Sequence, residues 1–262
     1  MKPSNFLYHP MILLDNREME YRFCMQNIKI DNGLFLEFGV YNGKSINIFS
    51  KLKPNNIFKH KIIMKPSSFL YHPMILLNNR EMEYRFCMQN IKIDDGLFLE
   101  FGVYNGKSIN IFSKLKPSNI FHGFDTFEGL PEEWDLGHKK IEAGHFVLDK
   151  MPKVEKNVLL YKGLFEDTIP EWKTQYHEKI SFINIDCDLY SSTKTVLENL
   201  NSQIVKDTII RFDDLFPSPI SPYPNWLNGE WKALSEWVKG FDRKIIPIAR
   251  SWKQGCTVLV LK

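Results

Sequence analysis

The chain has 262 residues, of which 44% are hydrophobic, and its formal net charge is only +3. This composition is typical of a globular protein with a substantial core. Basic residues are scattered among acidic ones, which excludes the charge pattern of a nucleic-acid-binding or membrane-surface protein. Because no stretch has the form of a secretion signal or a membrane span, we expect a cytoplasmic protein without nucleic-acid or membrane partners.

The first part of the chain is duplicated. Residues 1–58 recur almost letter for letter as residues 64–121. The offset is 63 residues, so Glu37 of the first copy corresponds to Glu100 of the second. Only the second copy runs directly into further strand-like sequence, whereas five residues separate the first copy from the second. If the first copy supplied the strand of the main sheet, the loop to the next strand would double in length about four times. This lengthening would cost roughly 2.4 kcal/mol in closure entropy.

We therefore predict two unequal parts: an appendage at residues 1–63 and one functional domain at residues 64–262. The appendage contains a strand-like stretch, residues 34–40, but no partner strands of its own. A single strand and helix cannot bury their apolar faces alone. We expect a loosely attached helical segment from Tyr8 to Ile28, with any strand pairing confined to a sheet edge.

The second copy begins a series of alternating strands and helices. An amphipathic segment starts near Met74 and ends at Asp95, where Gly96 breaks it. The predicted strands are 97–103, 120–125, 158–161, 180–186, 208–212, 244–249 and 257–261, and the clearest predicted helices are 106–115, 192–203 and 229–238. Strands that alternate with helices predict an α/β fold with a mostly parallel sheet covered on both faces. Ligands of such sheets bind beyond the carboxyl ends of the strands, near the switch point.

The segment from Glu100 to Ser108 joins the first of these strands to a helix. Gly102 and Gly106 allow the backbone to approach a ligand closely. Because the full three-glycine dinucleotide fingerprint is absent, a ligand without phosphates fits better than a dinucleotide. Glu100 is suited to orient the amino group of a methionine moiety, so we predict an S-adenosylmethionine site. The alternative is an ordinary strand-to-helix turn.

Asp125 ends the second predicted strand. It follows Glu100 by about 25 residues, close to the spacing at which an acid accepts hydrogen bonds from ribose hydroxyls. Its alternative role is to cap a turn, since Thr126 and Gly129 follow. The sequence favours neither role over the other.

Two pairs of acids follow two apolar strands. Asp186 and Asp188 end one strand, and Asp213 and Asp214 end the next. Carboxylates gathered at one edge repel each other unless they are protonated or neutralised, and an all-oxygen group suits a hard cation such as magnesium. We predict a magnesium site, with a helix cap as the alternative role of Asp188.

Two histidines, His138 and His145, lie between the second and third predicted strands, in a segment that we predict to form an active-site flap. Either could act as a general base near neutral pH, although a surface position is the simpler interpretation of each. Four aromatic residues could wall an acceptor pocket or pack in the core. They are Trp134, Tyr223, Trp226 and Trp231.

Taken together, these residues resemble the macrocin O-methyltransferase family, metal-dependent class I methyltransferases that act on sugar hydroxyls of natural products. The resemblance covers the chain from about residue 70 to its end. Its most specific motifs are Glu100–Val103, Gly123–Pro131, Asp186–Thr193 and Asp213–Asp214. It implies a Rossmann-like class I methyltransferase fold with a mostly parallel, seven-stranded sheet and helices on both faces.

The resemblance also implies roles for individual residues. Asp186, Asp213 and Asp214 would bind Mg²⁺, and Asp186 or a flap histidine such as His145 would be the catalytic base. The residues expected at S-adenosylmethionine are Glu100, Gly102, Tyr104, Gly106, Ser108, Asp125, Gly163 and Phe165. The expected partner is a small-molecule acceptor with a sugar or nucleotide-sugar hydroxyl, and a homo-oligomer is compatible with the sequence.

Two other functions stay open at this level. Asp186–Cys187–Asp188 has the Asp-x-Asp form by which many glycosyltransferases hold the metal of a nucleotide sugar. A non-catalytic protein, whose duplicated front blocks the site, is the third hypothesis. Binding of S-adenosylhomocysteine, of a sugar nucleotide, or of the cofactor without turnover separates the three.

Overall fold

The computed structural model describes residues 74–217, 222–251 and 255–262. The predicted appendage at residues 1–63, with its helix from Tyr8 to Ile28, lies outside the described residues. Its boundary with a domain that begins at residue 64 therefore stays a prediction.

Eight strands form one sheet in the described residues, in the order β1-β9-β10-β8-β7-β2-β3-β6. Neighbouring strands are parallel, except that β10 is antiparallel to both β8 and β9. The strands are β1 (Ile75–Leu77), β2 (Leu97–Phe101), β3 (Phe121–Asp125), β6 (Val158–Lys162), β7 (Ile180–Ile185), β8 (Ile209–Phe212), β9 (Ile245–Ser251) and β10 (Cys256–Val260). The predicted α/β fold with a mostly parallel sheet is confirmed.

The prediction of seven strands was one short for the described sheet. The additional strand is β1, which pairs with β9 in parallel at the edge of the sheet. Its three residues are too few to show a period of their own, and we had assigned them to the amphipathic segment from Met74. Helix α4 (Arg80–Gln89) begins only after Asn79, whose side chain accepts a hydrogen bond from the Met82 backbone N–H.

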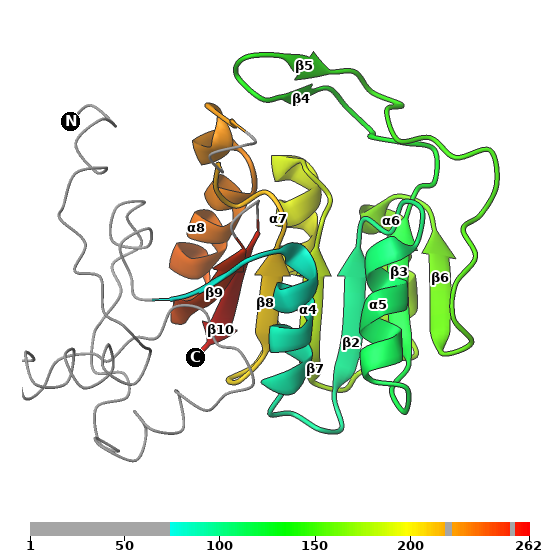
Figure 1. The fold of residues 1–262 in the computed structure, drawn as a ribbon, viewed down its shortest axis with the longest axis vertical. Coiled ribbons are helices and arrows are strands. Elements are labelled where there is room, and N and C mark those ends of the chain that lie inside the picture. Colours follow the sequence, from blue (N-terminus) through cyan, green and yellow to red (C-terminus); the bar gives the residue numbers. More distant parts are fainter. Residues whose placement is uncertain (1–73, 218–221, 252–254) are drawn as a thin grey trace, which may run out of the picture.

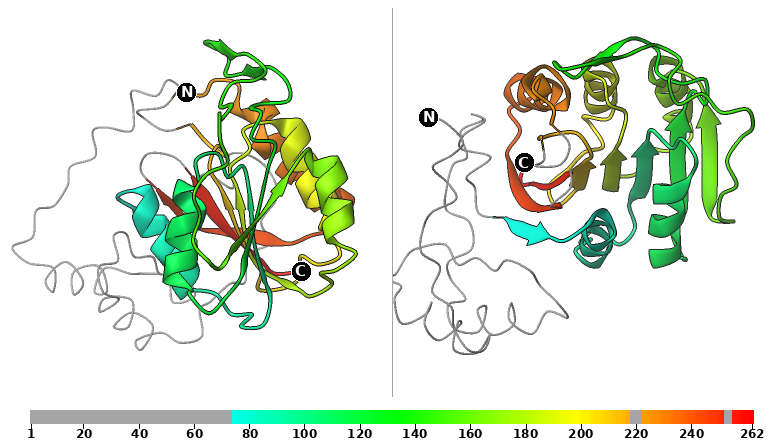
Figure 2. Two further views of the ribbon diagram at one scale, coloured as in Figure 1. Left: turned by 90° about the vertical axis from the view of Figure 1, so that its right-hand side faces the viewer. Right: turned by 45° about the horizontal axis from the view of Figure 1, so that its top comes forward.

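Helices cover both faces of the sheet (Figures 1 and 2). Helices α4 and α5 (Lys107–Leu115) lie on one face, and α6 (Phe165–Trp172), α7 (Tyr190–Asn199) and α8 (Glu230–Gly240) lie on the other. Helix α6 was not predicted from the sequence, because it has only eight residues and contains Pro170. Its buried residues Phe165, Ile169 and Trp172 nevertheless have helical spacing. In the described part of the chain, no helix combines the length and the apolar character that a membrane crossing needs.

Strand β2 contributes side chains to both apolar layers. Leu99 and Phe101 pack in the layer toward α6, α7 and α8, whereas Phe98 packs in the layer toward α4 and α5. The rings of Phe101 and Phe124 stack with their centroids 4.7 Å apart. Burial on both faces makes a central parallel strand a continuous apolar run, which is why this strand could be predicted from the sequence.

The strand order reverses between β2 and β7. The chain runs outward from β2 through β3 to β6 and then returns to β7 on the other side of β2. Loops that follow these strands meet at the carboxyl edge of the sheet, where ligands of parallel sheets bind. The predicted flap contains a hairpin of β4 (Trp134–Asp135) and β5 (Lys140–Ile141), which lies above this edge in Figure 1.

We expect a chain without residues 1–63 to fold and to bind S-adenosylhomocysteine as the full chain does. Every strand of the described sheet lies between residues 75 and 260, and Met64 restarts the opening sequence. Its melting temperature, measured by calorimetry, should stay within about 3 °C of the full-length value or exceed it, a difference of about 1 kcal/mol. Aggregation of the shortened chain, or loss of its affinity for the cofactor product, would place the first copy within the fold.

Candidate active site

The loop between β2 and α5 depends on glycine at Gly102. This residue has a φ of +87°, and a Cβ atom there would lie 1.8 Å from the backbone oxygen of Asp186. Gly106, with a φ of +79°, precedes the first turn of α5. The loop therefore passes so close to the chain after β7 that no side chain fits at Gly102.

Asp125, at the end of β3, accepts hydrogen bonds from two backbone N–H groups. Oδ2 accepts from Tyr104 and Oδ1 from Phe127, each at 2.7 Å. The bond to Phe127 is the turn cap that the sequence suggested as one alternative. Asp125 also lines a cavity, and each carboxylate oxygen has a second lone pair for a ribose hydroxyl. The two predicted roles are thus compatible.

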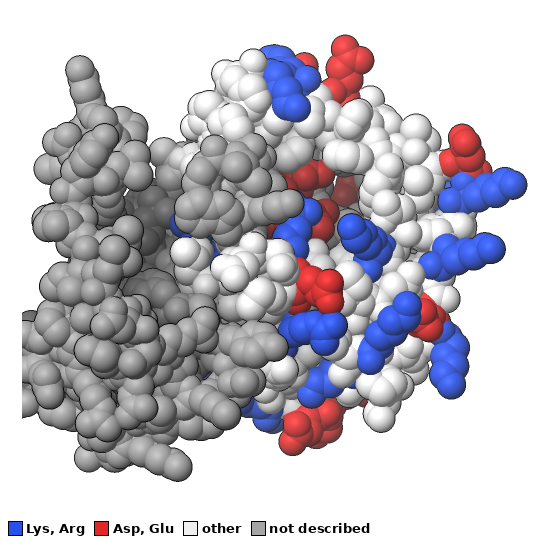
Figure 3. Space-filling model, in the orientation of Figure 1, with Lys and Arg blue, Asp and Glu red and all other residues white. Residues whose placement is uncertain are grey.

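Two neighbouring cavities open at the carboxyl edge and share part of their walls. The smaller, of about 490 Å³, lies between the loop after β2, the end of β3 and the start of α6. The larger, of about 950 Å³, extends from α4 to the β4–β5 hairpin. Figure 3 shows a hollow on this face with acidic atoms inside it and basic side chains beside it. Both cavities are lined by Gly102, Tyr104, Phe146, Asp186 and Asp188.

The predicted cofactor residues divide into those on the cavity walls and those behind them. Asp125 and Phe165 line the smaller cavity, and Ser108 lines the larger one. Gly102 and Tyr104 line both. The remaining three, Glu100, Gly106 and Gly163, line neither. Those three residues can therefore affect cofactor binding through the conformation of the loops that line the cavities.

Asp186, Asp188 and Asp214 come together at the ends of β7 and β8. One carboxylate oxygen of each lies within 4.8 Å of the other two. Burial raises the pKa of all three above the ordinary range, to about 7 for Asp214. The negative charge of Asp213 adds to the effect at Asp186 and Asp214, and that of Asp214 adds to it at Asp188. Asp188 does not cap α7, because Leu189 is the N-cap residue and no side chain caps that helix. Asp188 therefore belongs to the acidic group.

Asp213 is engaged by two arginines. Its Oδ1 accepts a hydrogen bond of 2.5 Å from the buried Arg211, and its Oδ2 lies 2.6 Å from the Arg80 guanidinium. Neither arginine was singled out in the sequence. The predicted ligand set of Asp186, Asp213 and Asp214 therefore contains Asp213 where the group of close carboxylate oxygens contains Asp188.

Glu230, the first residue of α8, is a further buried acid at this edge. Its Oε2 accepts a hydrogen bond of 3.0 Å from the Asp214 backbone N–H, whereas Oε1 is buried without a hydrogen-bond partner. Burial, followed by the charge of Asp214, raises the pKa of Glu230 well above its ordinary value. Acids are common in the first turn of a helix, so the burial of Glu230 could not be predicted from the sequence.

The two flap histidines occupy different positions. His138 lines the larger cavity. His145 is exposed, its ring packs against Phe146 with centroids 4.3 Å apart, and it lines neither cavity. Asp186, the other predicted base, lines both cavities.

The four predicted pocket aromatics also separate. Trp134 and Tyr223 wall the larger cavity, and the Trp134 indole donates a hydrogen bond of 3.1 Å to the Tyr223 hydroxyl. This contact attaches the flap to the segment that precedes α8. Trp226 and Trp231 pack against each other and against Phe216 at the main core instead.

Glu100 lies buried beneath the loop, with both carboxyl oxygens engaged. Oε1 accepts from the Ser108 hydroxyl at 2.9 Å, and Oε2 accepts from the Asn184 amide at 3.0 Å. Burial raises the pKa of Glu100 to about 8. Glu100 thus supports the loop from below.

Replacement of Glu100 by glutamine should relieve a pH-dependent loss of stability. Because the folded-state pKa of about 8 exceeds the ordinary 4.5, the stability that Glu100 contributes is complete below pH 4.5 and is lost as the pH rises through 8. Relative to the parent protein, Glu100→Gln should gain about 3 kcal/mol in the free energy of unfolding between pH 5 and pH 8, measured with urea.

The duplication offers a matched control for this measurement. Glu37→Gln makes the same change in the first copy and should leave the pH dependence of stability as it is in the parent. If Glu100→Gln shifted stability equally at both pH values, Glu100 would not be a buried carboxyl with a raised pKa.

Comparisons with known proteins concern the family and the fold. Residues 99–215 match the family model Methyltransf_24, described as a methyltransferase domain. The solved structure of calicheamicin methyltransferase CalS11 is 19% identical, with a TM-score of 0.53 and 94% of each chain covered. That of the O-methyltransferase NovP is 21% identical, with a TM-score of 0.50 and 70% of this chain and 80% of NovP covered.

At these identities the structural matches show the fold alone. A search of curated proteins found no match. The matched segment includes the glycine loop, Asp125 and the acids after β7 and β8. The family match and the fold together identify residues 99–215 as a class I, S-adenosylmethionine-dependent methyltransferase domain.

Proposed function

We propose that the protein transfers the methyl group of S-adenosylmethionine to a hydroxyl of a sugar or nucleotide sugar, assisted by a divalent cation such as Mg²⁺. One observation carries the proposal: Asp186 and Asp188 line both cavities. A cofactor in one cavity and an acceptor in the other would therefore meet beside two carboxylates. The names of NovP and CalS11, an O-methyltransferase and a calicheamicin methyltransferase, accord with such an acceptor.

The smaller cavity suits the cofactor. Asp125 is placed to accept from ribose hydroxyls, and Leu164 and Phe165 offer an apolar surface to adenine. Toward the junction, Gly102 and Tyr104 line the wall where the methionine part would lie. The absence of a side chain at Gly102 lets this wall pack directly against the Asp186 backbone.

The larger cavity suits a sugar. Trp134 and Tyr223 offer an apolar wall to a sugar ring, and the carboxylates that line the same cavity can accept from its hydroxyls. Lys107 and Lys139 also line it, and both are exposed. Their charges favour an acceptor that carries phosphate, such as a nucleotide sugar.

The acidic group suits a hard divalent cation, because three carboxylate oxygens lie close together and none of the three ligands is cysteine or histidine. Asp186 and Asp214 belong both to the predicted ligand set and to this group. Asp188 supplies the third oxygen, since both oxygens of Asp213 are in ion pairs. A bound cation would lower the pKa of an acceptor hydroxyl.

In the proposed reaction, Asp186 accepts the hydroxyl proton. The acceptor oxygen forms a bond to the methyl carbon as the carbon–sulfur bond breaks, and the electron pair of that bond stays on sulfur in S-adenosylhomocysteine. The protein contributes by holding the oxygen in line with the sulfonium methyl group. Asp186→Asn should lower kcat by about a hundredfold or more, whereas His145→Gln should leave it within about twofold. The opposite pattern would make His145 the base.

Activity should depend on the cation and on its carboxylate ligands. Chelation should abolish turnover and added magnesium should restore it. Asp186→Asn, Asp188→Asn and Asp214→Asn should each weaken Mn²⁺ binding by at least about tenfold, and Asp213→Asn by less. Isothermal titration checks this order. If Asp213→Asn abolished Mn²⁺ binding and Asp188→Asn left it intact, the ligand set predicted from the sequence would be the correct one.

Cofactor binding should depend on Gly102 of the second copy. A Cβ atom there would overlap the backbone of Asp186, so Gly102→Val should abolish S-adenosylhomocysteine binding. The matching change Gly39→Val, in the first copy, should leave the Kd within about twofold, less than about 0.5 kcal/mol. Loss of binding in the Gly39 variant and retention in the Gly102 variant would assign the cofactor to the first copy.

A mass-shift screen tests the acceptor directly. Free sugars, glycosides and nucleotide sugars are incubated with the cofactor and magnesium, and the expected result is a gain of one methyl group by a nucleotide sugar. The glycosyltransferase alternative predicts sugar-nucleotide binding without S-adenosylhomocysteine binding. Cofactor binding without methylation of any acceptor would favour the non-catalytic alternative.

A further inference from the structure

Arg211, in the middle of an apolar strand, is a buried arginine that the proposed reaction does not use. Its side chain is completely buried and lines neither cavity. Nε donates to Glu83 of α4 at 3.2 Å, and Nη1 donates to the Asn184 side-chain oxygen at 2.8 Å. Nη2 donates to Asp213 at 2.5 Å. One guanidinium thus joins α4, β7 and the chain after β8.

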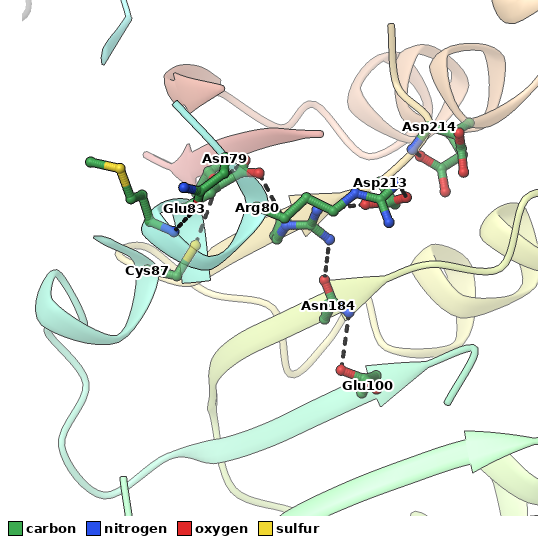
Figure 4. A network of polar contacts seen from close by, with 12 residues as sticks. Asn79, Arg80, Glu83, Cys87, Glu100, Asn184, Asp213 and Asp214 are labelled. Atoms are coloured by element: carbon green, nitrogen blue, oxygen red, sulfur yellow. Dashed lines mark hydrogen bonds and ion pairs between the residues drawn. The ribbon is translucent and has the colours of Figure 1, made fainter. Parts of the chain in front are cut away.

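The bond to Asn184 sets the orientation of that amide. With its oxygen held by Arg211, Asn184 presents its nitrogen to Glu100 (Figure 4). The reversed amide would direct its N–H groups at the guanidinium, which places donors against donors at that end. Arg211 therefore determines which end of the Asn184 amide faces Glu100.

Glu100 connects this arrangement to the loop between β2 and α5, the cofactor loop. Its other oxygen accepts from Ser108, in the first turn of α5, which follows the loop that lines both cavities. The chain from Arg211 through Asn184 to Glu100 and Ser108 is buried or half-buried along its length. Buried polar chains of this kind hold side chains in one geometry, because an unmade hydrogen bond there is costly.

The second branch leads to the acidic group. Arg211 and Arg80 hold the two oxygens of Asp213, the residue next to Asp214. Asp214 is part of the group of close carboxylates. A change at Arg211 thus disturbs both branches, whereas a change at Asn184 disturbs the branch to Glu100 alone.

We propose that Arg211 is a positioning residue that holds the cofactor loop and the cation-binding acids in one geometry, although it touches neither ligand. This inference rests on the proposed function. Lysine cannot replace arginine in this role, because an ammonium group lacks the planar fork that serves three acceptors from fixed positions.

The test measures the affinity of three variants for two ligands. Arg211→Lys should weaken binding of S-adenosylhomocysteine and of Mn²⁺, each by about tenfold. Asn184→Ala should weaken S-adenosylhomocysteine binding by about tenfold and leave Mn²⁺ binding within about twofold. Ser45→Ala, the first-copy counterpart of Ser108→Ala, should change neither. Titrations are done well below the melting temperature of each variant, so that a loss of stability alone leaves both affinities unchanged.

A double variant separates coupling from independent effects. If Arg211 acts through Glu100 and Ser108, then Arg211→Lys combined with Ser108→Ala should weaken S-adenosylhomocysteine binding no more than the stronger single change. A loss equal to the product of the single losses would overturn the proposal, as would unchanged affinities in folded Arg211→Lys. If Arg211→Lys fails to fold, Asn184→Ala with Ser108→Ala decides by the same criterion. Absence of S-adenosylhomocysteine binding in the parent protein would refute the proposed function instead.

Discussion

Among the described residues, more acidic than basic side chains are buried toward the carboxyl edge of this sheet. Glu83, Glu100, Asp213, Asp214 and Glu230 are all buried. Among the described residues, Arg211 is the only buried arginine or lysine. An ion that loses its water without a partner costs several kcal/mol, so each of these acids needs a counter-charge, a proton or a metal ion.

More than one of these ways to accommodate a buried acid occurs in the structure, and each occupies its own zone of the carboxyl edge. Near α4, Arg211 lies between Glu83 and Asp213, and its guanidinium packs 4.7 Å from the Tyr84 ring centre. The second zone, at the ends of β7 and β8, holds Asp186, Asp188 and Asp214, whose pKa values burial raises. A divalent cation would neutralise that second zone. The proposed cation and the buried arginine would thus serve the same purpose, which is to balance buried carboxylates.

Much of the fold could be predicted because the central strands are buried on both faces. The continuous apolar runs of β2 and β7 marked the middle of the sheet, and the acids after β7 and β8 had to meet because parallel strands end at one edge. The glycine loop was recognisable from its place between a strand and a helix. Short elements could not be predicted, because the three residues of β1 and the eight of α6 are too few to establish a period.

The sequence was less informative about which acids face each other. Beyond the end of a strand the alternation of side chains no longer applies, so nothing in the sequence distinguished Asp188 from Asp213 as the neighbour of Asp186 and Asp214. Arg211 did leave a signal, since an arginine within an apolar strand requires a buried counter-charge. Its partner Glu83 lies 128 residues earlier in the chain, and no local pattern connects the two.

Cofactor and cation are proposed to bind side by side where the two cavities share their walls. Crystals grown with S-adenosylhomocysteine and Mn²⁺, with data collected at the manganese absorption edge, would show whether they do. We expect an anomalous peak for a manganese ion within bonding distance of Asp186 and Asp214, with the adenosine beside Asp125 and the sulfur directed toward the metal. A manganese peak elsewhere, or a cofactor bound away from the loop at Gly102, would overturn this proposal.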